Sequence, residues 1–205
     1  MANRKIERFG LFDSIDDHFE FIKGNPIDQR GKDSIQWMWS YMDTLYKYAV
    51  QCNHITEIGV NQVNSTWAFL KAAPKRIVLV DIDFHRRPTK RIPDFCGFNM
   101  WLGKAMELAI DADISMRLIE GDSAEIEIEP TDLLFIDSDH KKIHFQKELD
   151  RHLYKVSKYL IVHDTTLFGS ELWPPIRELI ESNQFILTER ITTGCGLTVL
   201  QRNRF

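Results

Sequence analysis

From residue 54 onward, short apolar segments alternate with longer segments of helical periodicity, and this alternation constrains the fold more than any other feature. Seven segments have the length and the aliphatic content of strands: 55–58, 76–80, 115–119, 132–136, 159–162, 185–189 and 197–201. The helical segments between them are 65–73, 98–112, 141–156 and 175–182. Because strands that alternate with helices form parallel sheets covered on both faces, the sequence predicts an α/β protein with a doubly wound, seven-stranded, mostly parallel sheet.

The last two predicted strands follow each other without a helix. The segment Thr192-Thr-Gly-Cys-Gly196 joins them and is rich in turn-forming residues. Two adjacent strands joined by a short glycine-containing loop pair in opposite directions. We therefore expect an antiparallel hairpin at the C-terminal edge of an otherwise parallel sheet.

The first 53 residues carry helical patterns only. Ser14 and Asp17 can cap a short helix with Phe19 and Ile22 on one face. Residues 33–36, Asp-Ser-Ile-Gln, form a capping-box pattern ahead of an amphipathic helix of about 17 residues. We therefore divide the chain into an N-terminal helical extension, residues 1–53, and an α/β domain, residues 54–205. The extension is expected to serve as a lid or as the face of a homodimer, and the sequence leaves both open.

Composition excludes several classes of protein. A formal net charge of −4 does not favour general binding of phosphate backbones, so we expect no nucleic-acid partner. No apolar segment approaches the about 20 residues that span a bilayer, and the first eight residues lack the apolar stretch of a signal peptide. The three cysteines are widely spaced and form neither a disulfide framework nor a zinc motif. We expect a cytoplasmic protein with no membrane association.

Acidic side chains mark the ends of the first five predicted strands. Ligands of open parallel sheets bind outside the carboxyl ends of the strands, near the point where the strand order reverses. Clustered carboxylates raise each other's pKa unless a cation or ligand hydroxyls compensate, so five acidic strand ends at one sheet edge predict a ligand site. The five ends carry Glu57, Asp81, Asp122, Asp137 and Asp164.

The turn after the first strand has features of a nucleotide-binding loop without the G-x-G-x-x-G pattern. Gly59 lets a backbone approach a ligand closely. Ser65 and Thr66 follow near a helix N-terminus, where hydroxyls and backbone amides are available. Asp81 lies 24 residues after Glu57, a position suited to binding ribose hydroxyls.

The combination of motifs resembles the class I S-adenosylmethionine-dependent methyltransferases, which have a Rossmann-like fold. It is most similar to the small Mg²⁺-dependent O-methyltransferases related to catechol O-methyltransferase, the macrolide-sugar O-methyltransferases and the cephalosporin-hydroxylase-like group. The resemblance covers about residues 54–201 and implies methyl transfer to a hydroxyl of a small-molecule acceptor, assisted by Mg²⁺. The motifs that carry it are Glu57-Ile-Gly59, Ser65-Thr66, Asp81, Gly121-Asp-Ser123, Phe135-Ile-Asp-Ser-Asp-His140, Val162-His-Asp-Thr165 and the last strand.

The resemblance also implies roles for individual residues. In the cofactor site, Glu57 and Gly59 would lie beside the methionine part, and Ser65 would hold its carboxylate. Asp81 would bind the ribose hydroxyls. The adenine would be bordered by Asp122 and Ser123.

Catalysis and metal binding are implied for residues after the fourth and fifth strands. Asp137 and Asp164 would ligate Mg²⁺, with Thr165 near the third ligand position. Asp137 would thereby also take part in catalysis, because bound Mg²⁺ lowers the pKa of a substrate hydroxyl. His140 would be the general base as a neutral imidazole near pH 7, and His163 is expected to point into the core.

Two departures and two alternatives remain. Thr165 replaces the second acid or amide that these methyltransferases have after Asp164, and it is a weaker Mg²⁺ ligand. Val63-Asn64 stand where they have a third glycine, and a side chain there would crowd the cofactor or reshape the turn. If that turn has lost its function, the chain is a catalytically inactive binding or scaffold protein on the same fold. The second alternative is a metal-dependent hydrolase or oxygenase, because His140 and His144 would share a helix face close to Asp137 and Asp164.

Overall fold

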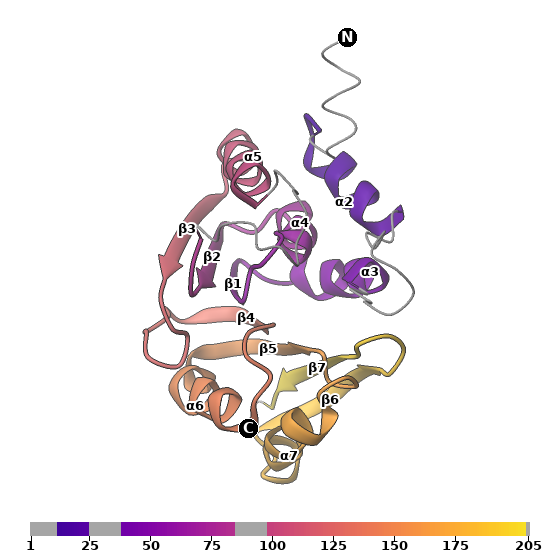
Figure 1. The fold of residues 1–205 in the computed structure, drawn as a ribbon, viewed down its shortest axis with the longest axis vertical. Helices are drawn as coiled ribbons and strands as arrows, with labels where there is room; N and C mark the ends of the chain where they lie inside the picture. The colour runs from indigo at the N-terminus through magenta and orange to yellow at the C-terminus, as the bar shows by residue number, and fades with distance from the viewer. Residues whose placement is uncertain (1–11, 25–37, 85–97, 204–205) are drawn as a thin grey trace, which may run out of the picture.

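A computed structural model describes residues 12–24, 38–84 and 98–203, and its centre is a single seven-stranded sheet (Figure 1). The strand order across the sheet is β3-β2-β1-β4-β5-β7-β6. All seven predicted strands are confirmed, with ends that differ by at most three residues. Their bounds are β1 His54–Ile58, β2 Arg76–Asp81, β3 Ser115–Glu120, β4 Thr131–Ile136, β5 Val156–His163, β6 Phe185–Ile191 and β7 Leu197–Arg202.

The first five strands are parallel, and the last two form the predicted antiparallel hairpin. β1 pairs in parallel with both β2 and β4, so the strand order reverses between β1 and β4. β7 returns between β5 and β6 and is antiparallel to both. A reversal next to β1 places the candidate ligand site at the carboxyl ends of β1, β2, β4 and β5.

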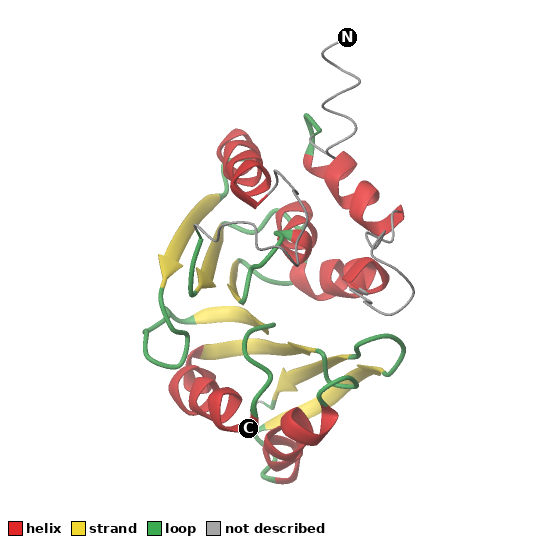
Figure 2. Ribbon diagram, viewed as in Figure 1, coloured by secondary structure: helices red, strands yellow, loops and turns green. Residues whose placement is uncertain are grey.

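Helices cover both faces of the sheet (Figure 2). One core joins α2, α3, α4 and α5 to one face, and a second core joins α6 and α7 to the other face. The confirmed arrangement is the doubly wound α/β fold that the sequence predicts. The bounds are α2 Ile15–Gly24, α3 Met38–Ala49, α4 Asn64–Lys71, α5 Phe98–Asp111, α6 Lys142–His152 and α7 Gly169–Glu181, with a short 3₁₀ turn at Leu153–Lys155.

The predicted start of α7 is wrong. The sequence predicts a helix that begins at residue 175, whereas α7 begins at Gly169 and contains Pro174 and Pro175. Each proline lacks the N–H that would bond to the carbonyl four residues earlier, which makes a helix start at proline the more natural prediction. The first turn forms nevertheless because Leu172 is buried against the second core together with Ile176.

The N-terminal helices belong to the main core. Ser14 caps α2 as predicted, with its Oγ accepting a hydrogen bond of 3.0 Å from the Asp17 amide. Phe19 and Leu45 are buried in the core that contains α4, and the His18 ring stacks on Trp67 with centroids 3.8 Å apart. The predicted capping box at residues 33–36 lies outside the described residues. A role of this region as a lid or a dimer face stays a prediction.

Tyr41 on α3 ties the N-terminal region to the hairpin loop. Its hydroxyl donates to the Thr193 carbonyl at 2.7 Å and accepts from the Gly196 amide at 2.8 Å. Gly196 has φ 88°, and a Cβ at this position would lie 2.3 Å from the Thr166 hydroxyl oxygen. The loop is therefore held against residues that directly follow β5.

Within the described ranges, no helix is long and apolar enough to cross a membrane.

Replacing Tyr41 with phenylalanine should lower the free energy of unfolding by about 1–3 kcal/mol, because the buried Gly196 amide loses its acceptor. Urea denaturation at constant pH measures the change. Tyr154→Phe is the matched control, since Tyr154 is 70% exposed and its loss should cost less than about 0.5 kcal/mol. Equal effects of the two substitutions would contradict the proposed tie.

Candidate functional site

A cavity of about 460 Å³ opens at the carboxyl edge of the sheet, where the strand order reverses. Its described lining comes from the first turn and the start of α4, the turns after β2, β3, β4 and β5, and single residues of α3, α6 and the loop before β7. This volume lies within the range of small-molecule sites. Of the residues that the sequence assigns to a site, the cavity is lined by Gly59, Ser65, Asp81, Asp122, Ser123, Asp137, His140 and Asp164.

The first turn is held against the end of β4 through Gly59. This glycine has φ 82°, and a Cβ at this position would lie 2.1 Å from the carbonyl oxygen of Asp137. Gly59 therefore packs against the chain's own backbone at Asp137 and also lines the cavity, and the backbone contact alone leaves no room for a side chain. The Asp137 amide completes the junction by donating to the Ile58 carbonyl at 2.8 Å.

Val63 takes a left-handed backbone conformation, which glycine adopts most readily. It lies at φ 63° and ψ 15° as the residue before α4, and a β-branched residue in this left-handed region carries strain of about 1–3 kcal/mol. Its side chain is completely buried in the core beside α4 and does not line the cavity. Val63 therefore does not project into the cavity, whereas Asn64, the other residue of this pair, borders it.

Glu57 lies beneath the cavity wall. It is fully buried, and the hydroxyls of Ser65 and Thr66 donate to its two carboxylate oxygens. Burial raises the pKa of Glu57 to about 8, although both hydroxyl donors oppose the shift. Glu57 itself does not line the cavity, so it orients Ser65 and Thr66 rather than facing the methionine part directly.

Asp81 joins the end of β2 to the first turn. One of its carboxylate oxygens accepts from the amides of Val60 at 2.9 Å and Asn61 at 3.1 Å. Its other oxygen accepts from the Asp83 amide at 3.2 Å. The side chain lines the cavity while only 5% of the residue is exposed. Asp81 therefore fixes the shape of the first turn from the position at which ribose binding is expected.

Near the end of β3, a polar group surrounds a buried carboxylate that the sequence analysis missed. Glu148 on α6 is completely buried, and the hydroxyls of Ser123 and Ser138 donate to the same oxygen. His144 Nε2 lies 3.2 Å from Ser123 Oγ and 3.3 Å from Glu148 Oε1, so His144 lines the cavity instead of the outer surface. Burial raises the pKa of Glu148. Asp122 borders the same region and accepts from the Ala124 amide at 2.9 Å.

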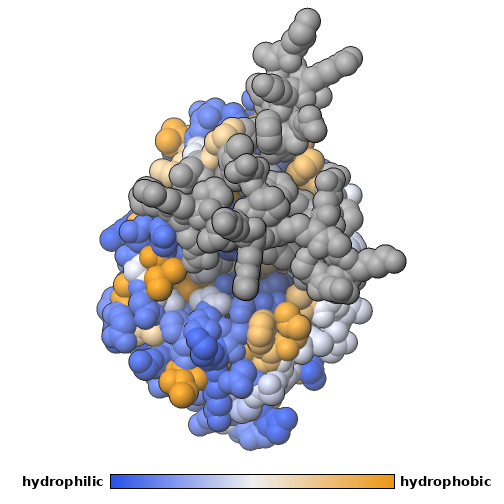
Figure 3. Space-filling view, in the orientation of Figure 1, coloured by the Kyte–Doolittle hydropathy of each residue, from blue (hydrophilic) through white to orange (hydrophobic). Residues whose placement is uncertain are grey.

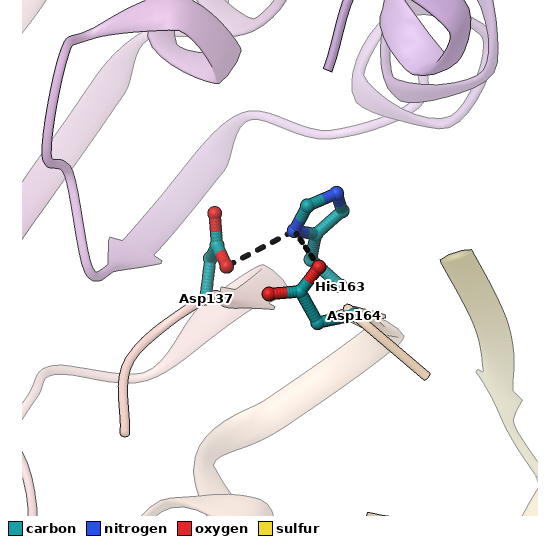
Figure 4. A group of neighbouring side chains, drawn as sticks. All are labelled: Asp137, His163 and Asp164. Carbon is teal, nitrogen blue, oxygen red and sulfur yellow. Dashed lines mark hydrogen bonds and ion pairs between the residues drawn. The ribbon is translucent and has the colours of Figure 1, made fainter. Parts of the chain in front are cut away.

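Two carboxylates and two imidazoles converge where β4 and β5 end, and we call Asp137, His140, His163 and Asp164 the Asp–His cluster. His163 Nδ1 lies 3.0 Å from Asp137 Oδ1 and 3.3 Å from Asp164 Oδ1. His140 Nε2 lies 2.9 Å from Asp164 Oδ2 and 3.4 Å from Asp137 Oδ1. Figure 4 shows that Asp137, His163 and Asp164 point toward one another from neighbouring strand ends.

The cluster changes the ionisation of its members. Burial lowers the pKa of His140, but the carboxylates of Asp137 and Asp164 outweigh it and raise the pKa to about 9. His163 shows the same balance, and its pKa is raised by Asp137. Burial raises the pKa of Asp137, yet the charges of the two imidazoles bring it below its ordinary value. At neutral pH, His140 is therefore protonated in this structure, contrary to the neutral base that we expected.

Thr165, which the resemblance places near Asp137 and Asp164 as a third metal ligand, bonds to a different partner in the structure. The Thr165 residue is 1% exposed, and its hydroxyl oxygen accepts from the Thr198 hydroxyl at 2.9 Å. His163 lies beside Asp137 and Asp164 instead. As expected, its side chain is buried, and the ring of Tyr41 in the main core meets its ring edge-on with centroids 5.3 Å apart. His163 also lines the cavity.

In the view of Figure 3, the surface below the grey atoms is mostly hydrophilic, and its hydrophobic residues form separate spots. Leu167 is 61% exposed at the rim of the cavity, and the next residue, Phe168, stacks on the His140 ring with centroids 4.5 Å apart. The cavity therefore has a polar wall at the strand ends and an apolar rim beside α7.

Sequence comparisons identify no relative of this chain. No protein-family model matches it, and no curated protein matches it. Solved structures do resemble it across nearly its whole length. TomG from Streptomyces achromogenes, an O-methyltransferase of tomaymycin synthesis solved with S-adenosylmethionine, has a TM-score of 0.56 at 15% identity, covering 94% of this chain and 91% of TomG.

Two further structures have the same architecture. A provisionally assigned caffeoyl-CoA O-methyltransferase from Staphylococcus aureus has a TM-score of 0.59 at 13% identity, with 94% and 93% of the two chains covered. The Podospora anserina methyltransferase PaMTH1, solved with S-adenosylhomocysteine, has a TM-score of 0.54 at 16% identity, with 99% and 95% covered. These likenesses show that the chain has the Rossmann-like fold of class I S-adenosylmethionine-dependent methyltransferases.

Replacing Glu57 with glutamine should change how stability depends on pH. An unfolded glutamate has a pKa of about 4.5 and Glu57 has one of about 8 in the fold, so between these values the native state holds a proton that the unfolded state has lost. The stability contributed by the wild-type residue therefore falls by up to about 1.4 kcal/mol per pH unit as pH rises through this window.

Urea unfolding at pH 5.5, 6.5 and 7.5 measures the difference between Glu57→Gln and the wild type. The difference should shift steadily in favour of the variant with rising pH. Thr56→Val, at the buried neighbouring position of β1, changes no charge and should give a constant difference. A constant difference for Glu57→Gln as well would contradict the raised pKa.

Proposed function

We propose that the protein transfers a methyl group from S-adenosylmethionine to a hydroxyl of a small-molecule acceptor. The observation that carries this proposal is the position of Asp81. It borders the cavity where the strand order reverses, and its carboxylate accepts hydrogen bonds from two amides of the first turn. A carboxylate in this place is suited to ribose hydroxyls because it accepts hydrogen bonds and forces the loop close to the ligand. The fold of the three structural neighbours supports the same reading.

The beginning of α4 suits the amino-acid end of the cofactor. Asn64 lines the cavity, and its side-chain oxygen is buried and finds no hydrogen-bond partner among the described residues. An ammonium group would satisfy this oxygen. The first amides of α4 have no partners inside the helix and favour a carboxylate. Asn64 and Ser65 would therefore hold the zwitterion, while Glu57 keeps the Ser65 hydroxyl oriented from below.

The other end of the cavity suits the nucleoside. Ribose hydroxyls would donate to Asp81. The adenine would lie between Ile82, which is 62% exposed at the cavity, and the turn that carries Asp122 and Ser123. Glu148 holds the Ser123 hydroxyl in place from the buried side, and this support keeps the turn rigid.

The Asp–His cluster would receive the acceptor hydroxyl. S-adenosylmethionine, when bound, would supply a methyl group on a positively charged sulfur, which would keep the electron pair of the carbon–sulfur bond as the methyl carbon passes to the acceptor oxygen. The carboxylate of Asp137 would accept the departing hydroxyl proton. Protonated His140 would donate to the same oxygen and stabilise its negative charge. Holding oxygen, carbon and sulfur in line accounts for the remaining rate gain.

Mg²⁺ assistance, which the resemblance implies, receives little support from these residues. Mg²⁺ prefers six oxygen ligands, whereas two of the four cluster members offer imidazole nitrogen. The Thr165 hydroxyl, an oxygen donor expected at this position, is bonded to Thr198 instead. We therefore assign no step of the reaction to Mg²⁺.

Calorimetric titration with S-adenosylhomocysteine tests the proposal with a matched pair of variants. Asp81 and Asp132 each accept hydrogen bonds from two successive backbone amides, Asp81 at the cavity edge and Asp132 at the opposite edge of the sheet. Asp81→Asn should weaken binding at least about tenfold, and Asp132→Asn should leave it unchanged while lowering stability to a similar extent.

No binding to the wild type, with folding verified by circular dichroism, would overturn the proposal and favour the inactive scaffold. Equal weakening by both substitutions would attribute the Asp81 effect to general destabilisation. Once binding is established, transfer of a labelled methyl group to hydroxyl-bearing acceptors, compared with matched amines, tests the choice of oxygen.

A further inference from the structure

We infer that Glu148 is a positioning residue that makes the site select a 6-amino purine over a 6-oxo purine, by turning the hydroxyl protons of Ser123 and Ser138 away from the cavity. The inference rests on the proposed function, because it assumes that a nucleoside occupies this end of the cavity. It goes further by giving a role in ligand selection to a residue of α6, to which the resemblance assigns none.

Glu148 joins the turns that follow β3 and β4. Ser123 comes from the first of these turns and Ser138 from the second, and both hydroxyls donate to the same carboxylate oxygen, Oε1. Both serines line the cavity, whereas Glu148 is completely buried. One buried acceptor therefore takes the protons of two hydroxyls at the cavity wall.

The two serines can then only accept hydrogen bonds from a ligand. A serine hydroxyl carries one proton and two lone pairs, and here each proton is bonded to Glu148. His144 Nε2 lies 3.2 Å from Ser123 Oγ and 3.3 Å from Glu148 Oε1, so a proton on this nitrogen is also directed into the group. These contacts leave lone pairs, and no side-chain proton of the two serines, for the cavity.

Asp122 adds a further acceptor to the same part of the wall. Its side chain is 45% exposed and lines the cavity, and Oδ1 accepts from the Ala124 amide at 2.9 Å. An ionised carboxylate accepts hydrogen bonds and donates none. The side chains of Asp122, Ser123 and Ser138 therefore all present acceptors to a ligand at this end.

A wall of acceptors distinguishes purines by the group at position 6. A 6-amino group donates through its N–H bonds, whereas a 6-oxo group has only lone pairs and would face acceptors without a proton between them. Unpaired polar atoms in a buried contact are costly, and a site built to bond one polar group discriminates strongly against an analogue that cannot make the bond. The orientation of the two serine hydroxyls by Glu148 is therefore expected to decide the preference.

Calorimetric titration of the full chain with two ligands measures this preference. S-adenosylhomocysteine carries the 6-amino group, and S-inosylhomocysteine carries oxygen at the same position. We expect the wild type to bind S-adenosylhomocysteine at least about thirtyfold more tightly.

Glu148→Met is the decisive variant, because it keeps the volume of the side chain but removes the acceptor. The serine hydroxyls can then turn and donate to a 6-oxo group, so S-inosylhomocysteine should gain affinity and the ratio of the two affinities should fall at least about tenfold. A merely structural role of Glu148 would weaken both ligands alike. Glu148→Gln keeps an oxygen acceptor and should retain most of the preference.

Ser138→Ala is a milder variant with a matched control. It removes one acceptor from the wall and should lower the ratio about threefold. Ser157 also donates its hydroxyl to a carboxylate, that of Asp132 at 2.7 Å, but at the opposite edge of the sheet. Ser157→Ala should leave the ratio unchanged, and circular dichroism verifies that each variant folds.

The outcomes separate failure of the inference from failure of the proposed function. Equal binding of the two ligands by the wild type, or a ratio that neither Glu148→Met nor Ser138→Ala changes, would overturn the inference and leave the proposed function standing. Binding of neither ligand by the folded wild type would overturn the proposed function and the inference with it.

Discussion

The close contact between the first turn and the end of β4 is the constraint on which the site depends. At Gly59 the chain passes so near the Asp137 carbonyl that no side chain fits, and the Asp137 amide bonds to β1 in return. This contact fixes the start of the Ser-Asp-His segment, so the direction of the Asp137 side chain follows from backbone packing.

Carboxylates at the sheet edge are held in place by three different means. Asp81 is satisfied by backbone amides, Glu57 and Glu148 by hydroxyls, and the two acids of the Asp–His cluster by imidazoles. Glu57, with a pKa of about 8, is largely protonated at neutral pH, whereas the pKa of Asp137 is lowered. The acidic edge therefore carries much less repulsion than its composition suggests.

Most of the fold could be predicted because its signals are local. Strand length, helical periodicity and the Ser14 cap each depend on a few neighbouring residues, and the structure confirms them. The start of α7 could not be predicted this way, because burial of Leu172 outweighs the hydrogen bonds that two prolines remove. Val63 is a similar case, since the core around α4 compensates for a backbone conformation that valine ordinarily avoids.

Site residues were predicted where strand order alone determines their place. Asp81, Asp122, Asp137 and Asp164 line one cavity because parallel strands end at one edge. His163 is buried against Tyr41 on the same face as Ile161, as alternation along β5 predicts, but its contact with Asp137 and Asp164 could not be predicted because it depends on how the ends of β4 and β5 meet. A signal for Glu148 was present, since it lies one turn from Phe145 and from His152 on the buried face of α6. Its partners Ser123 and Ser138 come from other strands and required the structure.

A crystal structure of the protein with S-adenosylhomocysteine tests the central claim most directly. The account predicts the ligand in the cavity, with ribose hydroxyls on Asp81, the amino-acid end at Asn64 and Ser65, and its sulfur facing the Asp–His cluster. Density for the ligand at another surface, or in this cavity with the ribose turned away from Asp81, would contradict the account.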